Sequence, residues 1–264
     1  MSNGERIFVE AIKKYCAERD IAVDIRSDGW LIVMQRGQNR HIAFGYDIGL
    51  NSAIALRIAN DKSATAEMLA MSDIASVPHF LFLNPALDKH HSASEEWERM
   101  RKMLVTYPDG IVLKPNEGTS GRYVFLVKDE TVLQDAAKEI FSAHPSLAIS
   151  PYVKIEEEVR VILLDDVALA VYSKHRADDW RHNLDFGARP VLLERGEARA
   201  ASVALAIRAA KAIDIRFSSV DVVRVGGHWR VLEINSGVMM EALGRFYPEL
   251  VHATYSAALD KVFC

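Results

Sequence analysis

Two short apolar runs near the end of the chain, residues 218–224 and 228–234, are joined through Gly226-Gly227. A pair of glycines between runs rich in β-branched residues predicts an antiparallel hairpin with a tight turn, because glycine readily adopts the positive φ that such turns require. The strands on either side of the turn are therefore expected to pair directly with each other.

Three oxygen-bearing side chains lie on these two runs. Asp221 stands in the middle of the first run, and Glu233 and Asn235 stand two residues apart at the end of the second. Residues i and i+2 of a strand share a face, and pairing around the turn brings Asp221 beside Glu233. Such oxygens suit Mg²⁺ or Mn²⁺, which complete their shells with water and nucleotide phosphates. The alternative is an ordinary solvent-facing set, although acidic residues are depleted in strands.

A second hairpin is expected over residues 111–127. An apolar run ends at Lys114, a short loop with Gly118 and Gly121 follows, and residues 123–127 form a second apolar run. Glycines let backbone N–H groups approach phosphate oxygens, and Lys114 adds a point charge beside them. The pattern is neither a Walker loop nor a dinucleotide fingerprint, because both of these lead into a helix. The loop is therefore either a phosphate site or a plain turn.

The composition excludes several classes of protein. The chain has 264 residues, half of them hydrophobic, and its net charge of −4 gives no basic field for nucleic acid or an anionic membrane surface. No window approaches the ~20 apolar residues of a membrane span, and the first residues do not resemble a signal peptide. The two cysteines, Cys16 and Cys264, support neither a disulfide framework nor a cysteine metal site. We expect a soluble cytoplasmic protein without a nucleic-acid or membrane partner.

Helical and strand patterns are mixed along the rest of the chain, without repeats. Helices are expected over residues 5–19, 51–59, 63–71, 94–107, 131–141, 197–213 and 238–264. Strands are expected over residues 21–25, 30–35, 41–44, 80–83, 159–164 and 167–172, with a short apolar segment over residues 147–152. Asp61 is placed to cap the helix that follows it. Several neighbouring strands are antiparallel, so the expected class is α+β.

Lys114, the Glu-Gly-Thr-Ser-Gly loop after it and the Asp221/Glu233/Asn235 group together resemble the ATP-grasp enzymes in order and spacing. The similar branch includes the D-alanine:D-alanine ligases, glutathione synthetases, cyanophycin synthetases and glutamate ligases that extend peptide tails. The resemblance runs from about Ala59 to the helix after Asn235. It implies an ATP-grasp fold with two α+β subdomains that clamp the nucleotide, preceded by a short N-terminal α/β substrate domain. The implied domains are residues 1–58, 59–150 (the lid subdomain region) and 151–264 (with the metal site).

The resemblance also implies a set of nucleotide-binding residues. Asn60-Asp61-Lys62, followed by Val77-Pro78, is similar to the family segment whose lysine reaches the phosphates, and Glu158 is similar to the acid that binds the ribose. The segment that ends at Val153 resembles the linker that binds adenine. The implied nucleotide-binding set is Lys62, Lys114, Glu117, Gly118, Thr119, Ser120, Gly121, Tyr152, Val153 and Glu158.

Metal and substrate residues follow from the same resemblance. Asp221, Glu233 and Asn235 would hold two Mg²⁺ ions, with Mn²⁺ as an alternative and Glu233 bridging the pair. Arg181 and Asn183 lie in a segment similar to the one that faces the reacting carboxyl group. The implied acid pocket is lined by Tyr172, His175, Arg176 and Met239, with Arg176 counted among the catalytic residues. A plainer alternative is that Arg160, Lys174 and Arg176 decorate an exposed strand.

Three positions depart from the family pattern. Tyr123 stands where a further loop glycine is common, which would stiffen the lid. Pro151 stands where the linker usually offers an acid to adenine, a contact that Glu156 or Glu157 would replace. Residues 236–240 replace the usual loop after the metal-binding asparagine.

The implied activity is that of a carboxylate-amine ligase. An acid attacks the γ-phosphate of ATP, and the resulting acylphosphate is captured by an amine, with an amino acid or peptide as substrate and ADP as product. One alternative is a kinase of the same fold that phosphorylates a small-molecule hydroxyl, and another is a non-catalytic nucleotide-binding module. The family tends to form dimers or tetramers, so a homodimer is consistent with the resemblance.

Overall fold

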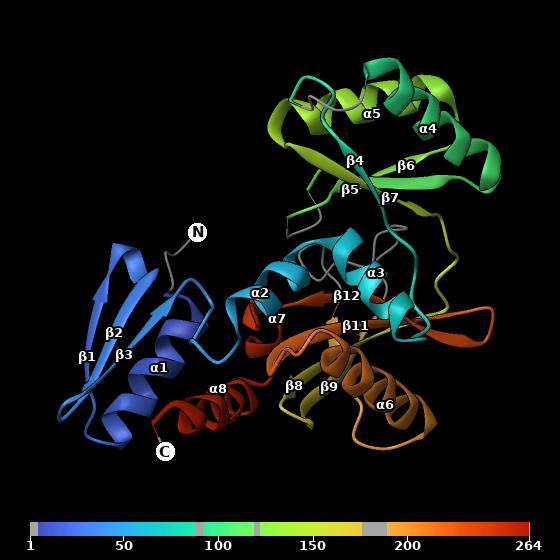
Figure 1. The fold of residues 1–264 in the computed structure, drawn as a ribbon. Helices are drawn as coiled ribbons and strands as arrows, with labels where there is room; N and C mark the ends of the chain where they lie inside the picture. The colour runs from blue at the N-terminus through green and yellow to red at the C-terminus, as the bar shows by residue number, and fades with distance from the viewer. Residues whose placement is uncertain (1–4, 88–91, 119–121, 176–188, 264) are drawn as a thin grey trace.

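The computed structural model describes residues 5–87, 92–118, 122–175 and 189–263. These residues form three separate sheets, in which every pair of neighbouring strands is antiparallel. Helices cover each sheet, and the sheets lie in three parts of the molecule (Figure 1). The expected α+β class is therefore confirmed.

The N-terminal part is a three-stranded meander on one helix. It consists of α1 (Ile7–Glu18), β1 (Ala22–Arg26), a 3-10 turn η1 (Ser27–Gly29), β2 (Leu31–Arg36) and β3 (Asn39–Phe44). Alternate residues of β2, Ile32 and Met34, are fully buried, as period-two patterning requires.

A four-stranded sheet with two helices forms a second lobe, shown at the top of Figure 1. Its elements are β4 (Phe80–Leu83), α4 (Ala93–Thr106), β5 (Ile111–Pro115), β6 (Phe125–Val127), α5 (Glu130–Ala143) and β7 (Ser146–Pro151), and the strand order is β4-β7-β5-β6. The core between this sheet and its helices includes Leu113, Leu147 and Ile140, each with no exposed surface. The expected hairpin over residues 111–127 is confirmed by the pairing of β5 with β6.

The third and largest sheet has the strand order β10-β9-β8-β11-β12. Its strands are β8 (Glu157–Leu164), β9 (Val167–His175), β10 (Arg189–Leu192), β11 (Phe217–Val225) and β12 (His228–Asn235). The helices that pack against it include α2 (Ala53–Asn60), α3 (Lys62–Met71) and α6 (Glu197–Ala212). Ala55, Ala209 and Val220 belong to the cluster that these elements bury together.

The chain ends in two helices rather than the single helix expected over residues 238–264. They are α7 (Glu241–Gly244) and α8 (Pro248–Phe263). Proline lacks the N–H of an interior helical residue and restricts the residue before it, but it fits the first position of a helix. Pro248 therefore starts α8, and the single-helix expectation was wrong.

β10 is a further difference, because no strand was expected there. Pro190 lies inside this strand, and proline argues against a central strand since it cannot donate to the ladder. β10 is an edge strand of the described sheet and pairs with β9 on one side. Proline is tolerated at such an edge because its missing N–H can face away from the ladder.

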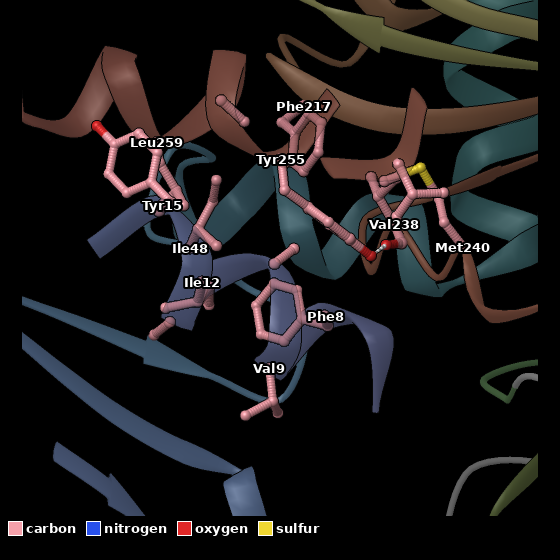
Figure 2. Close-up of a cluster of buried hydrophobic side chains, with 14 of the residues drawn as sticks. Phe8, Val9, Ile12, Tyr15, Ile48, Phe217, Val238, Met240, Tyr255 and Leu259 are labelled. Atoms are coloured by element: carbon pink, nitrogen blue, oxygen red, sulfur yellow. Dashed lines mark hydrogen bonds between the residues drawn. The ribbon is translucent and has the colours of Figure 1, made fainter. Parts of the chain in front are cut away.

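The N-terminal part docks on the C-terminal helices and the large sheet. Phe8, Ile12 and Tyr15 of α1 pack in one cluster with Phe217 of β11 and Tyr255 of α8 (Figure 2). The hydroxyl of Tyr255 donates to the Val238 carbonyl at 2.6 Å, so its polar end is satisfied inside the core. Helix α1 near the start of the chain and α8 near its end thus share one hydrophobic core. The domain boundaries expected at residues 58 and 150 stay a prediction. None of the helices in the described ranges is long and apolar enough to cross a membrane.

Candidate active site

Asp221 and Glu233 are direct partners across the β11–β12 pair, and Asn235 lies opposite Ser219. The register shifts between Asp221 and Val222, so a β-bulge lies next to the carboxylates. The side-chain amide of Asn235 donates to Glu233 Oε1 at 3.2 Å. The turn at Gly226-Gly227 therefore brings the three oxygen-bearing residues together as the sequence predicted, and their role as metal ligands stays a prediction.

Asp221 is neutralised by two cations from neighbouring strands. Arg160 of β8 donates to both carboxylate oxygens, at 2.7 and 2.6 Å, and Lys174 of β9 lies 3.1 Å from Oδ2. Lys174 also pairs with Glu158 of β8. Asp221, Glu158 and Lys174 are all buried. The alternative that Arg160 and Lys174 decorate an exposed strand is therefore wrong for these two residues.

The charges of this group shift one another's pKa values. Burial opposes ionisation of Asp221, yet Arg160 and Lys174 outweigh it and hold the pKa of that carboxyl well below its usual range. For Glu158, burial dominates and raises the pKa, with Lys174 opposing. Burial and Arg160 act to lower the pKa of Lys174, but Asp221 and Glu158 leave it raised. The neighbouring cations thus favour the ionised form of Asp221.

The acceptor positions that remain free on Asp221 and Glu233 determine how these carboxylates could bind a metal ion. A carboxylate has about four lone-pair sites, and Asp221 spends two on Arg160 and one on Lys174. Asp221 can therefore offer one further contact, whereas no ion pair to Glu233 is found among the residues that the structure describes. Among the described residues no cluster of three or more His, Cys, Asp or Glu could hold a metal. The set of two acids and one amide still matches the oxygen preference of Mg²⁺, with Glu233 the best placed of the three.

Lys62 begins α3 beside the start of the glycine loop. Asp61 caps this helix by accepting from the Ala64 N–H at 2.8 Å, as expected. The Lys62 ammonium donates to the Gly118 carbonyl at 2.9 Å. Burial lowers the pKa of Lys62, and Glu233, Asp61 and Glu117 oppose that effect. The Lys62 ammonium therefore lies within electrostatic range of the Glu117-Gly118 segment and of Glu233.

Asn116 is a site residue that sequence reasoning missed. It is almost fully buried, and its side-chain oxygen accepts from the Ser63 N–H at 3.1 Å. Its backbone carbonyl accepts from the Lys62 N–H at 3.2 Å. Asn116 thus fastens the end of β5 to the first turn of α3. An asparagine directly before the Glu117-Gly118 turn was the only signal in the sequence.

Lys114 lies on β5, paired with Ala148 of β7. Burial lowers its pKa to about 8; Glu233 opposes this shift and Lys62 adds to it. Lys62 and Lys114 therefore come from different elements but act on each other and on the same carboxylate. This is the arrangement that binding of a polyanion together with a cation requires.

Two positions that depart from the family pattern, Tyr123 in the lid and Pro151 in the linker, lie in the described part of the chain. Tyr123 adopts φ of 56°, the left-handed conformation that favours glycine, at the position where the family commonly has one. At the linker, the Tyr152 N–H donates to the Gly110 carbonyl at 2.9 Å. Glu156 and Glu157 are the acids expected to replace the contact at Pro151. Their carboxylates lie 3.4 and 3.6 Å from the guanidinium of Arg224, so both form ion pairs with that arginine.

Several predicted residues lie outside the described ranges: Thr119, Ser120, Gly121, Arg176, Arg181 and Asn183. Of the expected acid pocket, Tyr172 is buried and Met239 is 40% exposed, while His175 is the last residue of β9. The functional assignment of all these residues stays a prediction.

Comparison with known families fits this geometry. The sequence profile of the RimK-like ATP-grasp domain matches residues 59–247. The chain therefore belongs to the RimK-like ATP-grasp family, and the expected family membership is confirmed. The match begins at the residue before the Asn60-Asp61-Lys62 segment and includes Asp221, Glu233 and Asn235.

Two relatives that are named as ligases are longer than this chain. A protein named probable alpha-L-glutamate ligase from Shewanella halifaxensis is 24% identical over 209 residues, which are 77% of this chain and 42% of that protein. A protein of the same name from Legionella pneumophila (strain Corby) is 23% identical over 197 residues, covering 74% of this chain and 61% of that protein. The chain thus spans 42–61% of the length of these two relatives.

Solved structures share the fold at low identity. The D-alanine–D-alanine ligase from Bacillus anthracis complexed with ATP has a TM-score of 0.59 at 20% identity, over 80% of this chain and 66% of that one. A bifunctional glutathione synthetase from Pasteurella multocida has a TM-score of 0.57 at 14% identity, over 96% of this chain and 44% of that one. These likenesses show that the fold is the ATP-grasp fold.

Proposed function

We propose that this chain is an ATP-dependent, ADP-forming carboxylate-amine ligase that acts on an amino acid or peptide. One observation carries the proposal: Lys62 of α3 and Lys114 of β5 both act electrostatically on Glu233, which sits beside Asp221 and Asn235. Two lysines and an oxygen-ligand group meet where the two lobes approach each other. Such a site suits a nucleoside triphosphate with its divalent cation.

The proposed reaction needs positioning and charge neutralisation more than covalent chemistry from the protein. A carboxylate oxygen of the acid attacks the γ-phosphorus of ATP, the bond to ADP breaks, and an acylphosphate forms. The amine nitrogen then attacks the carbonyl carbon, loses a proton, and phosphate leaves as the amide forms. Lys62 and Lys114 hold the phosphate oxygens, and the backbone of residues 118–121 covers them and excludes water.

The remaining residues have assigned roles within this proposal. Glu233 and Asn235, with the remaining contact of Asp221, would hold two Mg²⁺ ions, or Mn²⁺ in their place. When bound, such ions neutralise the charge on the β- and γ-phosphate oxygens. Glu158 binds the ribose, and the linker at Tyr152 and Val153 binds adenine. Arg181 and Asn183, with Arg176, face the reacting carboxyl group.

The name of these relatives, probable alpha-L-glutamate ligase, suggests L-glutamate as the first substrate to test. We also propose that the protein acts in the cytoplasm, as a homodimer, on small-molecule substrates and without nucleic acid or membrane.

The test is ADP and phosphate release from Mg²⁺-ATP with a pooled panel of amino acids and short peptides, followed by mass spectrometry. The proposal predicts release that requires both an acid and an amine, with a product lighter by one water than their sum. A phosphorylated product without an amide would replace the ligase with a kinase. Tight ATP binding without release in any pool would favour a nucleotide-binding module instead.

A further inference from the structure

Asparagine side chains tie both ends of α2 to the end of the β11–β12 hairpin that lies away from its turn. Asn51, just before the helix, accepts at Oδ1 from the Phe217 N–H at 2.9 Å and donates from Nδ2 to the Phe217 carbonyl at 2.7 Å. Asn60, the last residue of the helix, accepts at Oδ1 from the Ser236 hydroxyl at 2.9 Å. Phe217 begins β11 and Ser236 follows the last residue of β12, so the two ties hold the same end of the hairpin.

The tie at Asn60 leads directly into Lys62. Asp61, the one residue between them, belongs to the ends of both helices. Its N–H donates to the Ile58 carbonyl of α2 at 3.1 Å, and its carboxylate accepts from the Ala64 N–H of α3 at 2.8 Å. Because Asp61 is bonded to both helices, the position of Asn60 determines where Lys62 stands. α2 and α3 lie between the large sheet and the second lobe (Figure 1).

The tie at Ser236 leads just as directly into the carboxylate group. Ser236 is 5% exposed and follows Asn235, whose side-chain amide donates to Glu233 Oε1 at 3.2 Å. Asn235 is the last residue of β12 and pairs with Ser219 of β11, so the ladder ends at this residue. The Ser236 hydroxyl therefore continues the support of the strand end through α2 instead of through β11.

One hydrogen bond thus connects the supports of two groups that the proposed nucleotide would bridge. Lys62 would hold a phosphate oxygen, while Glu233 and Asn235 would hold the cation on the same triphosphate. Functional groups of a site act well only when their geometry is held to within about 0.5 Å. A misplacement of about 1 Å can lower a rate by about a hundredfold. The bond between Asn60 and Ser236 is therefore placed to set this spacing.

We propose that Asn60 and Ser236 are positioning residues: their hydrogen bond fixes the spacing between the phosphate-binding lysine at the start of α3 and the cation-binding group at the end of β12. This inference rests on the proposed function, because it assigns Lys62 to a phosphate and Glu233 and Asn235 to a cation. In this role neither Asn60 nor Ser236 touches the nucleotide. The bond acts on the coupling between cation and phosphate binding rather than on either contact alone.

The test is ATP affinity, measured by calorimetry in Mg²⁺ and again in EDTA, with melting temperatures in parallel. The ratio of the two affinities reports how strongly cation and phosphate binding support each other. We expect Ser236→Ala and Asn60→Ala each to lower this ratio about fivefold, the effect of one ordinary hydrogen bond, while affinity in EDTA stays within about twofold of wild type. The double variant should lower the ratio no further, because both changes remove the same bond. Ser236→Thr keeps the hydroxyl and should keep the wild-type ratio.

A matched control exists at the other end of the same helix. Asn51→Ala removes the tie to Phe217 and should lower the melting temperature. It should leave the Mg²⁺ ratio unchanged, because that tie lies at the end of α2 away from Lys62. In a Lys62→Met background, Ser236→Ala should change the ratio less than about twofold, since the phosphate contact that it positions is already gone.

Three results would overturn the inference. The first is a drop in the ratio for Asn51→Ala equal to that for Asn60→Ala, since the effect would then follow from the packing of α2. The others are wild-type ratios in both Ser236→Ala and Asn60→Ala, and losses that multiply in the double variant. In each case Mg²⁺-dependent ATP binding by the wild type would still uphold the nucleotide site. A wild-type protein whose ATP affinity does not depend on Mg²⁺ would overturn the proposed function and this inference together.

Discussion

Asp221 and Glu233 stand opposite each other on β11 and β12, but within the described ranges Asp221 forms ion pairs with Arg160 and Lys174, whereas Glu233 forms none. Asp221 and Lys174 are buried and Arg160 is partly exposed beside them, whereas Glu233 is partly exposed and accepts from the side-chain amide of Asn235. The two carboxylates therefore differ in what they can still bind. Asp221 mainly holds the sheet charges together, and Glu233 is the carboxylate that remains open to a cation.

Glu233→Gln should lower metal-dependent ADP release by at least about a hundredfold, because a neutral amide cannot compensate a divalent cation beside Lys62 and Lys114. ADP release in the substrate panel is the measurement. Glu98→Gln is the matched control, since Glu98 is an exposed carboxylate of α4 that pairs with Arg101 outside the site. Rates like wild type in Glu233→Gln would remove Glu233 from the metal site.

Asp221→Asn should lower the free energy of unfolding by about 3–5 kcal/mol, because it leaves Arg160 and Lys174 without their shared anion. The pKa of Asp221 is held below its unfolded value, so its contribution is full above about pH 4 and is lost as pH falls. Denaturant unfolding at several pH values checks both points. Lys13→Met, which breaks an exposed pair with Glu5, should cost less than about 1 kcal/mol. Equal costs for the two variants would contradict the buried-network account.

ATP affinity should weaken about tenfold between pH 7 and pH 9. The pKa of Lys114 is about 8, and phosphate favours the charged lysine, so the binding contribution is present below that pKa and lost as pH rises. Calorimetric titrations across this range provide the measurement. Lys114→Arg should bind ATP with little change over the same pH interval, because arginine stays protonated. The same slope in both proteins would assign the pH dependence to another group.

Gly244→Ala should destabilise the protein by about 1–3 kcal/mol, because a Cβ at this position would collide with Cδ1 of Ile7. Ile7→Val removes that methyl group and should restore most of the loss in the double variant. Thermal unfolding of the two single variants and the double variant measures the coupling. Additive losses would show that α1 and α7 do not pack in this way.

The sequence predicted the elements whose signals are local. The Gly226-Gly227 turn predicted the register that brings Asp221 beside Glu233. Asp61, as a helix-capping residue, predicted the start of α3. Pro248 also carried a local signal for a helix start, but the apolar residues around it favoured one continuous helix.

Features that depend on distant packing could not be predicted in this way. From the sequence alone, Arg160 and Lys174 could be residues of an exposed strand. Their ion pairs with Asp221 become apparent only when the five-stranded sheet brings β8, β9 and β11 together. Asn116 is a polar residue that directly follows β5 in the sequence. Its importance appears only when α3 lies beside it, because its side-chain oxygen accepts from the Ser63 N–H.

The most direct measurement is oxygen transfer from the acid to phosphate. The acid found in the panel is labelled with ¹⁸O in its carboxylate, and the phosphate released in the presence of ATP and the amine is analysed by mass spectrometry. An acylphosphate requires one ¹⁸O in each released phosphate and the other in the amide. Phosphate without ¹⁸O, formed together with the amide, would contradict the ligase mechanism proposed for this site.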